Sequence, residues 1–223
     1  PFRMVTSHWK PGLIFTEMVK MDALVRADRG TYEILHYSDA MHPIGAQLCG
    51  SSPFYASQAT RILADMGFDV IDLNCGCPVD KVTKDGGGSG LLKTPLLIGE
   101  IVASMVQATS IPVTVKIRTG WDAEHVNVEE VVQIVESAGA KAVMVHGRTR
   151  SQGYTGTSSL EWIRRAKSAS KRIPVLGNGD ITSPEAAWNM FSATGCDGIV
   201  IGRATMCKPW IVEDIRRSAS GLP

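Results

Sequence analysis

Short apolar runs alternate with helical stretches along the whole chain, and this alternation restricts the fold more than any other feature of the sequence. It is the pattern of parallel strands joined by crossover helices. Seven apolar runs are predicted as strands, at residues 13–15, 44–48, 70–73, 113–117, 142–145, 174–176 and 198–201. Helices are predicted between them, from capping residues or prolines at Ser52-Pro53, Thr94-Pro95, Asn127 and Ser183-Pro184-Glu185.

Seven strand–helix units are one fewer than a closed (β/α)8 barrel requires. The chain begins on a stretch predicted as helix, so we expect the first strand of such a barrel to be missing. A doubly wound open sheet is the alternative, but the Gly-rich dinucleotide fingerprint that usually follows its first strand is absent. The sequence therefore favours the α/β class, as a (β/α)8 TIM barrel, with residues 1–223 forming a single domain.

Composition sets the broad class of protein. With 223 residues, 44% of them hydrophobic and 20% charged, the chain can bury a sizeable core. No apolar run reaches the length of a membrane span and no signal peptide is evident, so we expect a cytoplasmic protein. Five scattered cysteines argue against a disulfide framework and against a metal site. The net charge of +1 does not by itself indicate a nucleic-acid partner.

Polar residues follow several predicted strands, at the carboxyl ends where the working site of a barrel forms. These residues are Gln47, Asn74, Lys116, His146 and Asn178.

Lys116 alternates with Val115 and Ile117, so it points into the barrel if those two residues face the helices. A buried lysine needs a partner, and either a neighbouring carboxylate or the electron-rich ring of a flavin would satisfy it. His146 is either an ordinary core histidine or, because Arg148 follows it closely, part of a site for an anionic ligand.

Two glycine-containing segments follow the last two predicted strands. They read Gly177-Asn178-Gly179-Asp180 and Ile201-Gly202-Arg203. Barrels commonly hold a phosphate at these two loops, where glycines let backbone N–H groups approach it and an arginine adds charge. Either segment alone could be an ordinary turn, but together they indicate a phosphorylated cofactor.

Two cysteines lie close together after residues 70–73, in Asn74-Cys75-Gly76-Cys77-Pro78. Cys75 continues the strand and is expected to pack in the core. Cys77 lies past the strand between glycine and proline, so it can project over the barrel mouth. An ordinary thiol, with a pKa of about 8.5, is mostly protonated near neutral pH and can act as an acid. A buried structural cysteine is the alternative.

These segments together resemble the tRNA-dihydrouridine synthase family of flavoproteins. The resemblance covers nearly the whole chain, and its most specific elements are Asn74 to Pro78 and His146-Gly147-Arg148-Thr149-Arg150. The other matching segments are Thr16-Glu17-Met18-Val19, Gln47-Leu48, Val115-Lys116-Ile117-Arg118 and the two glycine segments.

The resemblance implies an FMN enzyme that takes hydride from NADPH and reduces the 5,6 double bond of uridine in tRNA. By the same resemblance, Cys77 is the catalytic proton donor, while Asn74 and Arg148 contact the substrate. The residues implied to bind the cofactor are Gln47, Lys116, His146, Asn178, Gly179, Asp180, Gly202 and Arg203.

The resemblance also implies parts that this sequence lacks, namely the first barrel strand and a C-terminal helical domain that helps to grip tRNA. Basic residues on the loops that would frame the entrance are candidates for RNA contact: Lys81, Lys84, Lys93, Arg148 and Arg150. Two other functions stay open, an FMN barrel acting on free pyrimidines, like dihydroorotate dehydrogenase, and a non-catalytic RNA-binding barrel.

Overall fold

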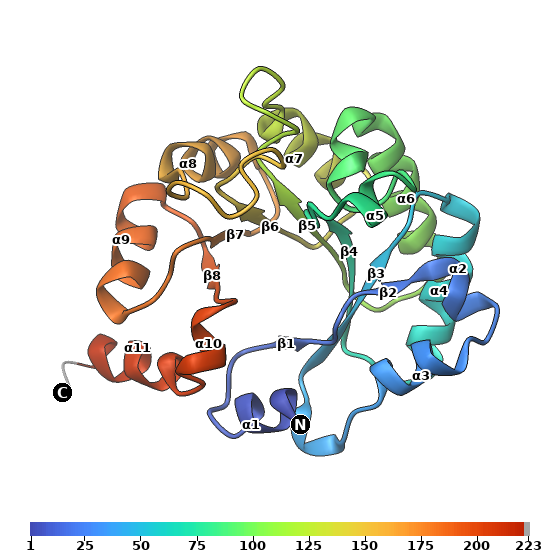
Figure 1. The fold of residues 1–223 in the computed structure, drawn as a ribbon, viewed down its shortest axis with the longest axis horizontal. Coiled ribbons are helices and arrows are strands. Elements are labelled where there is room, and N and C mark those ends of the chain that lie inside the picture. Colours follow the sequence, from blue (N-terminus) through green and yellow to red (C-terminus); the bar gives the residue numbers. More distant parts are fainter. Residues whose placement is uncertain (221–223) are drawn as a thin grey trace.

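The predicted strands form one curved, parallel sheet with helices along its outer side (Figure 1). The computed structural model describes residues 1–220. Its strands are β1 (Ile14–Phe15), β2 (Val19–Lys20), β3 (Ile44–Cys49), β4 (Val70–Cys75), β5 (Val113–Arg118), β6 (Ala142–His146), β7 (Val175–Asn178) and β8 (Gly198–Val200). Their order in the sheet is β1-β3-β4-β5-β6-β7-β8, and β2 also pairs with β3.

All seven predicted strands are present, each with one or both ends shifted by one or two residues. The additional strand, β2, has only two residues and was not predicted. It pairs with the end of β3 through Val19 and Leu48, while β1 pairs with the beginning of β3 through Ile14 and Ile44. β1 and β2 therefore act as two halves of one interrupted barrel strand.

The sheet curls as in a (β/α)8 barrel. Within residues 1–220, however, β8 and β1 are not hydrogen-bonded to each other, so the barrel is not closed. These two strands face each other across the open side of the ring in Figure 1. The chain is therefore a partial (β/α)8 barrel, as the sequence predicts, and not a doubly wound sheet.

The helices are α1 (Phe2–Ser7), α2 (Met21–Val25), α3 (Arg29–Leu35), α4 (Pro53–Asp65), α5 (Asp80–Thr83), α6 (Pro95–Ala108), α7 (Val128–Ser137), α8 (Leu160–Ala169), α9 (Pro184–Thr194), α10 (Ala204–Cys207) and α11 (Ile211–Ala219). The predicted caps of α4 and α9 are confirmed, because Ser52 and Ser183 accept hydrogen bonds from backbone N–H groups of the first turns. No helix in the described part of the chain has both the length and the apolar character needed to cross a membrane.

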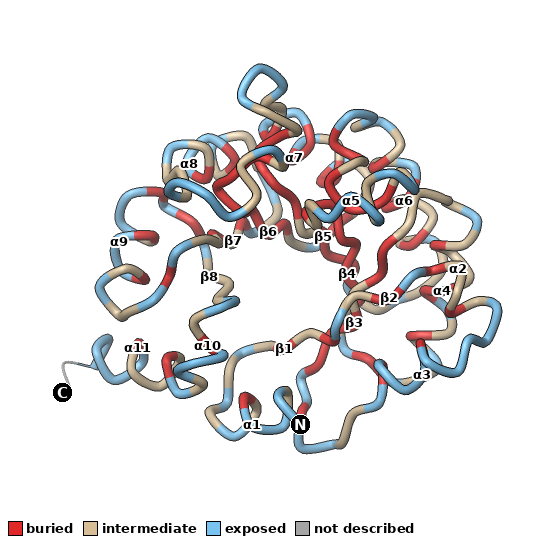
Figure 2. The backbone as a smooth tube through the Cα atoms, in the orientation of Figure 1, coloured by how far each residue is buried: buried red, intermediate tan, exposed pale blue. Residues whose placement is uncertain are grey.

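The main core lies between the sheet and the helices, where buried segments form a nearly continuous band in Figure 2. In β5, Val113, Val115 and Ile117 are at most 1% exposed and belong to this core. Their neighbours Lys116 and Arg118 line a cavity inside the barrel. The strand thus separates an apolar outer face from a polar inner face, because successive side chains point to opposite sides.

Two leucines on neighbouring helices test this placement of the core. Leu63 in α4 is 0% exposed, whereas Leu96 in α6 is 73% exposed. Leu63→Ala should lower the free energy of unfolding by about 2–5 kcal/mol, because it leaves a cavity. Leu96→Ala should change it by less than about 0.5 kcal/mol. Denaturant titration measures both changes, and equal losses would contradict the packing of α4 against the sheet.

Candidate functional site

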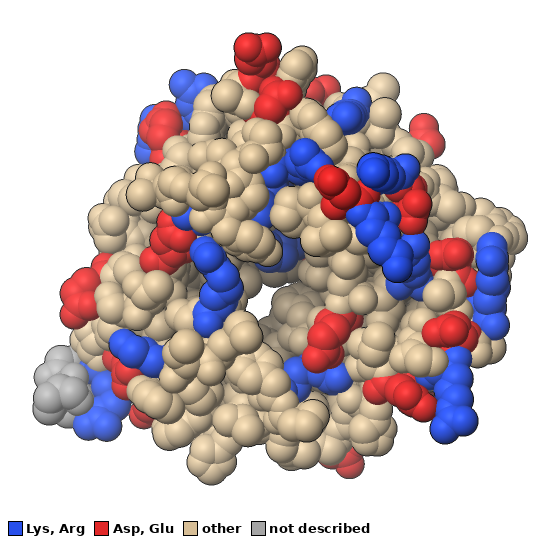
Figure 3. Space-filling model, in the orientation of Figure 1, with Lys and Arg blue, Asp and Glu red and all other residues tan. Residues whose placement is uncertain are grey.

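The inner face of the sheet borders a cavity of about 850 Å³ at the carboxyl ends of the strands. Figure 3 shows a hollow at the centre of this face, with basic side chains around it. The expected site residues that line it are Gln47, Asn74, Cys77, Lys116, His146, Asn178, Gly179, Asp180, Gly202 and Arg203. Strands from β3 to β8 and the loops after them thus deliver these residues to one place, and the volume suits a cofactor-sized ligand.

The loop that carries Cys77 is held from several sides. Asn74 Oδ1 accepts hydrogen bonds from the backbone N–H groups of Gly76 and Cys77, at 3.1 and 2.8 Å. The Cys77 carbonyl accepts from both the N–H and the hydroxyl of Ser89. Gly88 allows this approach, because a Cβ there would lie 2.8 Å from the Cys77 carbonyl oxygen. The free thiol of Cys77 is thereby fixed at the border of the cavity.

The other cysteines differ from Cys77 in exposure. Cys75 is 0% exposed, and this burial raises the pKa of its thiol well above the ordinary value. It packs in the core, as the sequence predicts. A second cavity thiol, Cys207 at the end of α10, is exposed and was not anticipated.

Two groups of opposite charge lie close together here, Lys116 on the cavity lining and Asp72 buried behind it. Burial lowers the pKa of Lys116 to about 8, although Asp72 partly opposes this shift. Burial raises the pKa of Asp72 to about 6, against hydrogen bonds from Thr114 and Gln47 and the charge of Lys116. The two charges influence each other, but within residues 1–220 no ion pair of 4.0 Å or less joins them. Lys116 is therefore a half-buried cation that lacks a contacting anion in the described part of the chain.

His146 is neutral at physiological pH, because burial and the nearby Lys116, Arg118 and Arg148 lower its pKa to about 3. Arg148 Nη1 lies 3.3 Å from His146 Nε2. An arginine can only donate, so Nε2 accepts and the ring carries its proton on Nδ1. His146, which lines the cavity, thus has Nδ1–H as its ring donor.

Arg148 does not line the cavity, although the sequence suggested a place at its entrance. The side chain is 2% exposed and forms a paired contact with Asp180, with N–O distances of 2.9 and 2.8 Å. Its remaining donors bind the carbonyls of Thr155 and Gly156. The expected position at the entrance is wrong, because the partner carboxylate draws Arg148 beneath the loop. A contact between Arg148 and substrate stays a prediction.

The two glycine segments lie side by side where β7 and β8 end. Asn178 donates from Nδ2 to the carbonyl of Val200, at 2.7 Å, and so joins the two strand ends. Gly179 has a φ of +126°, and a Cβ there would lie 2.2 Å from Ser158 Oγ. At Gly202 a Cβ would meet nothing within 4 Å, so its backbone faces open space. Arg203 is exposed beside it and lies 3.5 Å from Asp180.

Asp180 is held by basic and backbone donors and is not free to bind another group. Partial burial acts to raise its pKa, but hydrogen bonds from Arg148 and from the Ser158 N–H bring the pKa below the ordinary value. The carboxylate therefore organises the loop from within, and contact with a phosphate would have to come from its backbone.

The cavity lining is strongly basic. Among the described residues it contains Lys116, Arg118, Arg203 and Lys208, but Asp180 is its only acidic residue. Excess positive charge of this kind attracts anionic ligands. Within residues 1–220 no group of three or more His, Cys, Asp or Glu side chains is arranged to hold a metal ion.

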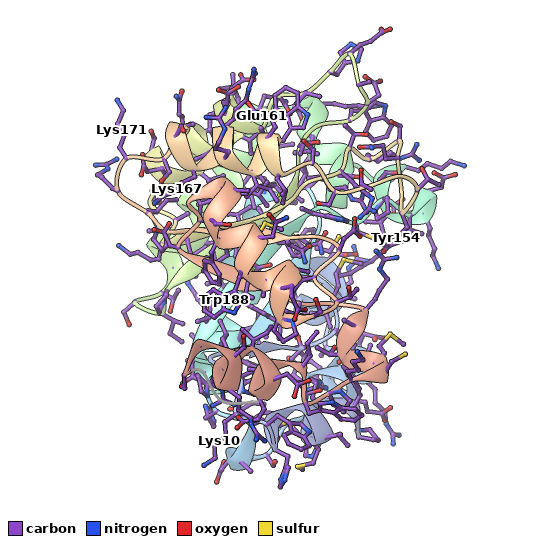
Figure 4. The ribbon with its side chains drawn as sticks, turned by 90° about the vertical axis from the view of Figure 1, so that its left-hand side faces the viewer. Lys10, Tyr154, Glu161, Lys167, Lys171 and Trp188 are labelled. Carbon is purple, nitrogen blue, oxygen red and sulfur yellow. The ribbon has the colours of Figure 1, made fainter. Side chains whose placement is uncertain are left out.

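Sequence reasoning gave no site role to Arg118 or Tyr154. Arg118 is 2% exposed and donates to the carbonyls of Gly76, Thr149 and Gly153, so it ties the loop after β4 to the loop after β6. Tyr154 lies on that second loop, at the end of the molecule opposite Lys171 in Figure 4. The alternation in β5 could have identified Arg118, since it shares the inward face with Lys116, whereas the loop position of Tyr154 gave no such signal.

Comparison with known proteins assigns the chain to a family. Residues 1–221 match the family model described as dihydrouridine synthase (Dus). The chain belongs to the dihydrouridine synthase family. This membership confirms the family that the motifs around Asn74, Cys77 and His146 resemble.

Individual relatives share this membership. The chain is 41% identical over 216 residues to tRNA-dihydrouridine synthase B of Pseudomonas syringae pv. tomato, covering 96% of this chain and 64% of that protein. It is 38% identical to tRNA-dihydrouridine synthase B of Xanthomonas axonopodis pv. citri, with the same coverage. A probable tRNA-dihydrouridine synthase 1 of Synechocystis is also 38% identical, with 96% and 60% covered. The chain thus spans slightly less than two thirds of these dihydrouridine synthases.

A solved structure supports the fold independently. Histamine dehydrogenase from Rhizobium sp. 4-9 superposes with a TM-score of 0.73 at 15% identity, covering 97% of this chain and 42% of that protein. At this identity the likeness concerns the fold alone, and it agrees with the partial barrel of this dihydrouridine synthase family member.

The buried charge of Lys116 predicts a pH-dependent gain in stability. Lys116→Met should raise the free energy of unfolding of the ligand-free protein at pH 7 by up to roughly 3 kcal/mol, since each pKa unit is worth about 1.4 kcal/mol. Below pH 8 the folded protein carries the buried charge and its full cost. From pH 8 towards 10.5 the folded state releases the proton, so the gain should shrink.

Denaturant titrations between pH 6 and 10 measure this gain. Lys171→Met is the control, because Lys171 is exposed at the far end of the molecule (Figure 4). If Lys116→Met does not raise the free energy of unfolding, or if its effect grows with pH, burial does not penalise the charge of Lys116.

Proposed function

We propose that residues 1–223 form the FMN-binding catalytic domain of a cytoplasmic tRNA-dihydrouridine synthase that uses NADPH to reduce uridine in tRNA to 5,6-dihydrouridine. One observation carries the proposal: Cys77, Lys116 and the two glycine segments converge on a single basic cavity of about 850 Å³. Membership of the dihydrouridine synthase family and the names of the relatives support the same reaction.

The cavity residues fit an FMN-like group. Lys116 lacks a contacting anion within the described residues, and an electron-rich ring above it would stabilise its charge. The phosphate would lie at the ends of β7 and β8, where the open space beside Gly202 leaves room and Arg203 adds a positive charge. His146 would donate its N–H there, and Gln47 and Asn178 would contact the ring and the ribityl chain.

When bound, FMN would supply the hydride equivalent that the uracil ring accepts at one carbon of its 5,6 double bond. Cys77 Sγ would hold the proton that goes to the other carbon, and the thiolate left behind would take a proton from solvent. The hydrogen bonds from the Cys77 backbone to Asn74 and from Ser89 to the Cys77 carbonyl keep this loop at the cavity border. Asn74, which lies between Gln47 and the thiol loop, would contact both cofactor and substrate.

A uridine in folded tRNA must leave its stack to reach such a cavity. The hollow in Figure 3 is open to solvent, and basic residues lie on the loops after β4 and β6. Lys93 Nζ lies 3.6 Å from the ring centroid of Trp121, and Arg150 lies 4.6 Å from the same ring while pairing with Asp80. These side chains give the entrance a positive and aromatic character that suits RNA.

Lys116 tests the cofactor assignment. Lys116→Ala in the intact protein should reduce bound flavin, or its rate of reduction by NADPH, by about tenfold or more, because a buried charged contact is lost. Lys116→Met keeps a side chain of similar length but removes its charge, so it should show the same defect. Flavin absorbance of the purified protein and stopped-flow reduction measure the two quantities. Normal flavin content and normal reduction in both variants would remove Lys116 from the cofactor site.

Cys77 tests the reaction itself. Cys77→Ala should still bind flavin and be reduced by NADPH, because the thiol acts only on the uracil. Turnover on tRNA should fall by about 10²–10⁴-fold, the usual contribution of a general acid. Separate measurement of flavin reduction and of its reoxidation by tRNA locates the defect in the second half-reaction.

Two other cysteines serve as controls for this experiment. Cys207→Ala removes the exposed thiol that shares the cavity, and Cys75→Ala removes a buried thiol next to the same loop. Both variants should retain the two half-reactions, with a modest loss of stability for Cys75→Ala. A selective defect in either control, or parental tRNA reduction by Cys77→Ala, would sink the assignment. Reduction of free orotate in place of tRNA would indicate a pyrimidine enzyme instead.

A further inference from the structure

An unbroken chain of side-chain hydrogen bonds runs from the cavity floor to the thiol loop. Thr114 donates to Asp72 Oδ1 at 2.6 Å, and Gln47 Nε2 donates to Asp72 Oδ2 at 2.7 Å. Asn74 Nδ2 then donates to Gln47 Oε1 at 2.7 Å. The far end is Asn74 Oδ1, which accepts the backbone N–H groups of Gly76 and Cys77.

The parallel register of three strands builds this chain. Gln47 on β3 is level with Asp72 on β4, and Asp72 is level with Thr114 on β5. Asn74 lies two residues after Asp72 and therefore points to the same inner face. The four side chains are thus brought together by strands that are themselves fixed in the core.

The groups at the two ends of this hydrogen-bond chain fix the same orientation for the amides between them. An ionised carboxylate only accepts, so Gln47 must turn its NH₂ group towards Asp72. Backbone N–H groups only donate, so Asn74 must turn its oxygen towards the thiol loop. The bond between the two amides then joins the Asn74 NH₂ group to the Gln47 oxygen, which is the arrangement observed. A flip of either amide would set two donors or two acceptors against each other.

We propose that Asp72 is a positioning residue, which fixes the orientation of the Gln47 and Asn74 amides and, through them, the placement of the Cys77 loop. Asp72 is 0% exposed and touches neither the thiol nor the open part of the cavity. It acts only through its neighbours. The inference rests on the proposed function for the role of Cys77, but the orientation of the amides does not depend on that role.

A second explanation for a buried aspartate here is charge balance with Lys116. Both Asp72 oxygens are occupied by Thr114 and Gln47, and within the described residues no ion pair joins Asp72 to Lys116. Burial raises the pKa of Asp72 to about 6, and the hydrogen bonds from Thr114 and Gln47 oppose this rise more strongly than the charge of Lys116 does. The geometry therefore favours hydrogen-bond direction over charge balance, and the two explanations predict different results for an asparagine.

Asp72→Asn removes the charge but keeps the direction in which the hydrogen bonds are donated. Its oxygen can accept from Gln47, and its NH₂ group can donate to the Thr114 hydroxyl, which turns to accept. Asp72→Leu removes both acceptors and leaves the Gln47 NH₂ group without a partner. The two variants thus separate the charge from the orientation.

The experiment measures hydrogen exchange at the backbone amides of Gly76 and Cys77, together with the rate at which iodoacetamide alkylates Cys77. Asp72→Leu should accelerate exchange at these two amides by about tenfold and should raise the alkylation rate, because the Gln47 amide loses its acceptor and no longer holds the Asn74 oxygen towards the two N–H groups. Asp72→Asn should restore exchange to within about threefold of the parental rate. If Asp72→Asn instead matches Asp72→Leu, charge balance is the role of Asp72 and the proposal fails.

Thr114 supplies a matched test that does not depend on Asp72→Leu folding. Thr114→Val alone should leave exchange at Gly76 and Cys77 near the parental rate, because Asp72 still accepts from Gln47. Thr114→Val combined with Asp72→Asn should accelerate it several-fold, since the asparagine then loses the hydroxyl that set its orientation. Additive behaviour of the two substitutions would overturn the proposal.

These measurements need neither RNA nor turnover, so they can fail or succeed separately from the proposed reaction. Thermal unfolding of each variant identifies a general loss of structure, which would accelerate exchange at core amides such as Val115 as well. Selective acceleration at Gly76 and Cys77 with parental exchange at Val115 is the expected result. Uniform acceleration in the Thr114→Val and Asp72→Asn double variant would count against a positioning role.

Discussion

Parallel pairing between β4 and β5 sets the geometry on which the rest of the site depends. It places Asp72 level with Thr114 and Asn74 level with Lys116, so the polar side chains of both strands share one face. All strands of a parallel sheet end at the same edge, and the loops after them therefore meet above that face. A shift of either strand by one residue would turn these side chains outward into the core and bring the valines and isoleucines inward.

Buried arginines join the loops above this face. Arg118 binds carbonyls from the loops after β4 and β6, and Arg148 binds two further carbonyls and the carboxylate of Asp180. Guanidinium groups suit this task because each offers several donors in a fixed plane. Arg148 is paired with Asp180, whereas Arg118 lines the cavity and adds to its positive charge. Arg118 thus contributes both to the support of the loops and to the basic character of the cavity.

The repeated strand–helix pattern was enough to predict the barrel, the positions of seven strands to within two residues and the inward direction of Lys116. It could not show β2, since two residues form no recognisable run and their pairing depends on the end of β3. Asp72 is the carboxylate that influences the pKa of Lys116. It lies 44 positions earlier in the chain, and only the pairing of β4 with β5 brings the two residues close together. Arg148 was misplaced for a similar reason, because its partner Asp180 comes from another loop.

The lengths of the strands at the open side of the sheet have a consequence for self-association. An unpaired strand edge exposes N–H and C=O groups on which another chain can add a strand. Here β1 and β2 have two residues each and β8 has three, whereas β3, β4 and β5 have six each and lie within the sheet. Within residues 1–220, the strands beside this gap therefore present short rows of backbone groups, and such short rows make a poor template for a strand added from another chain.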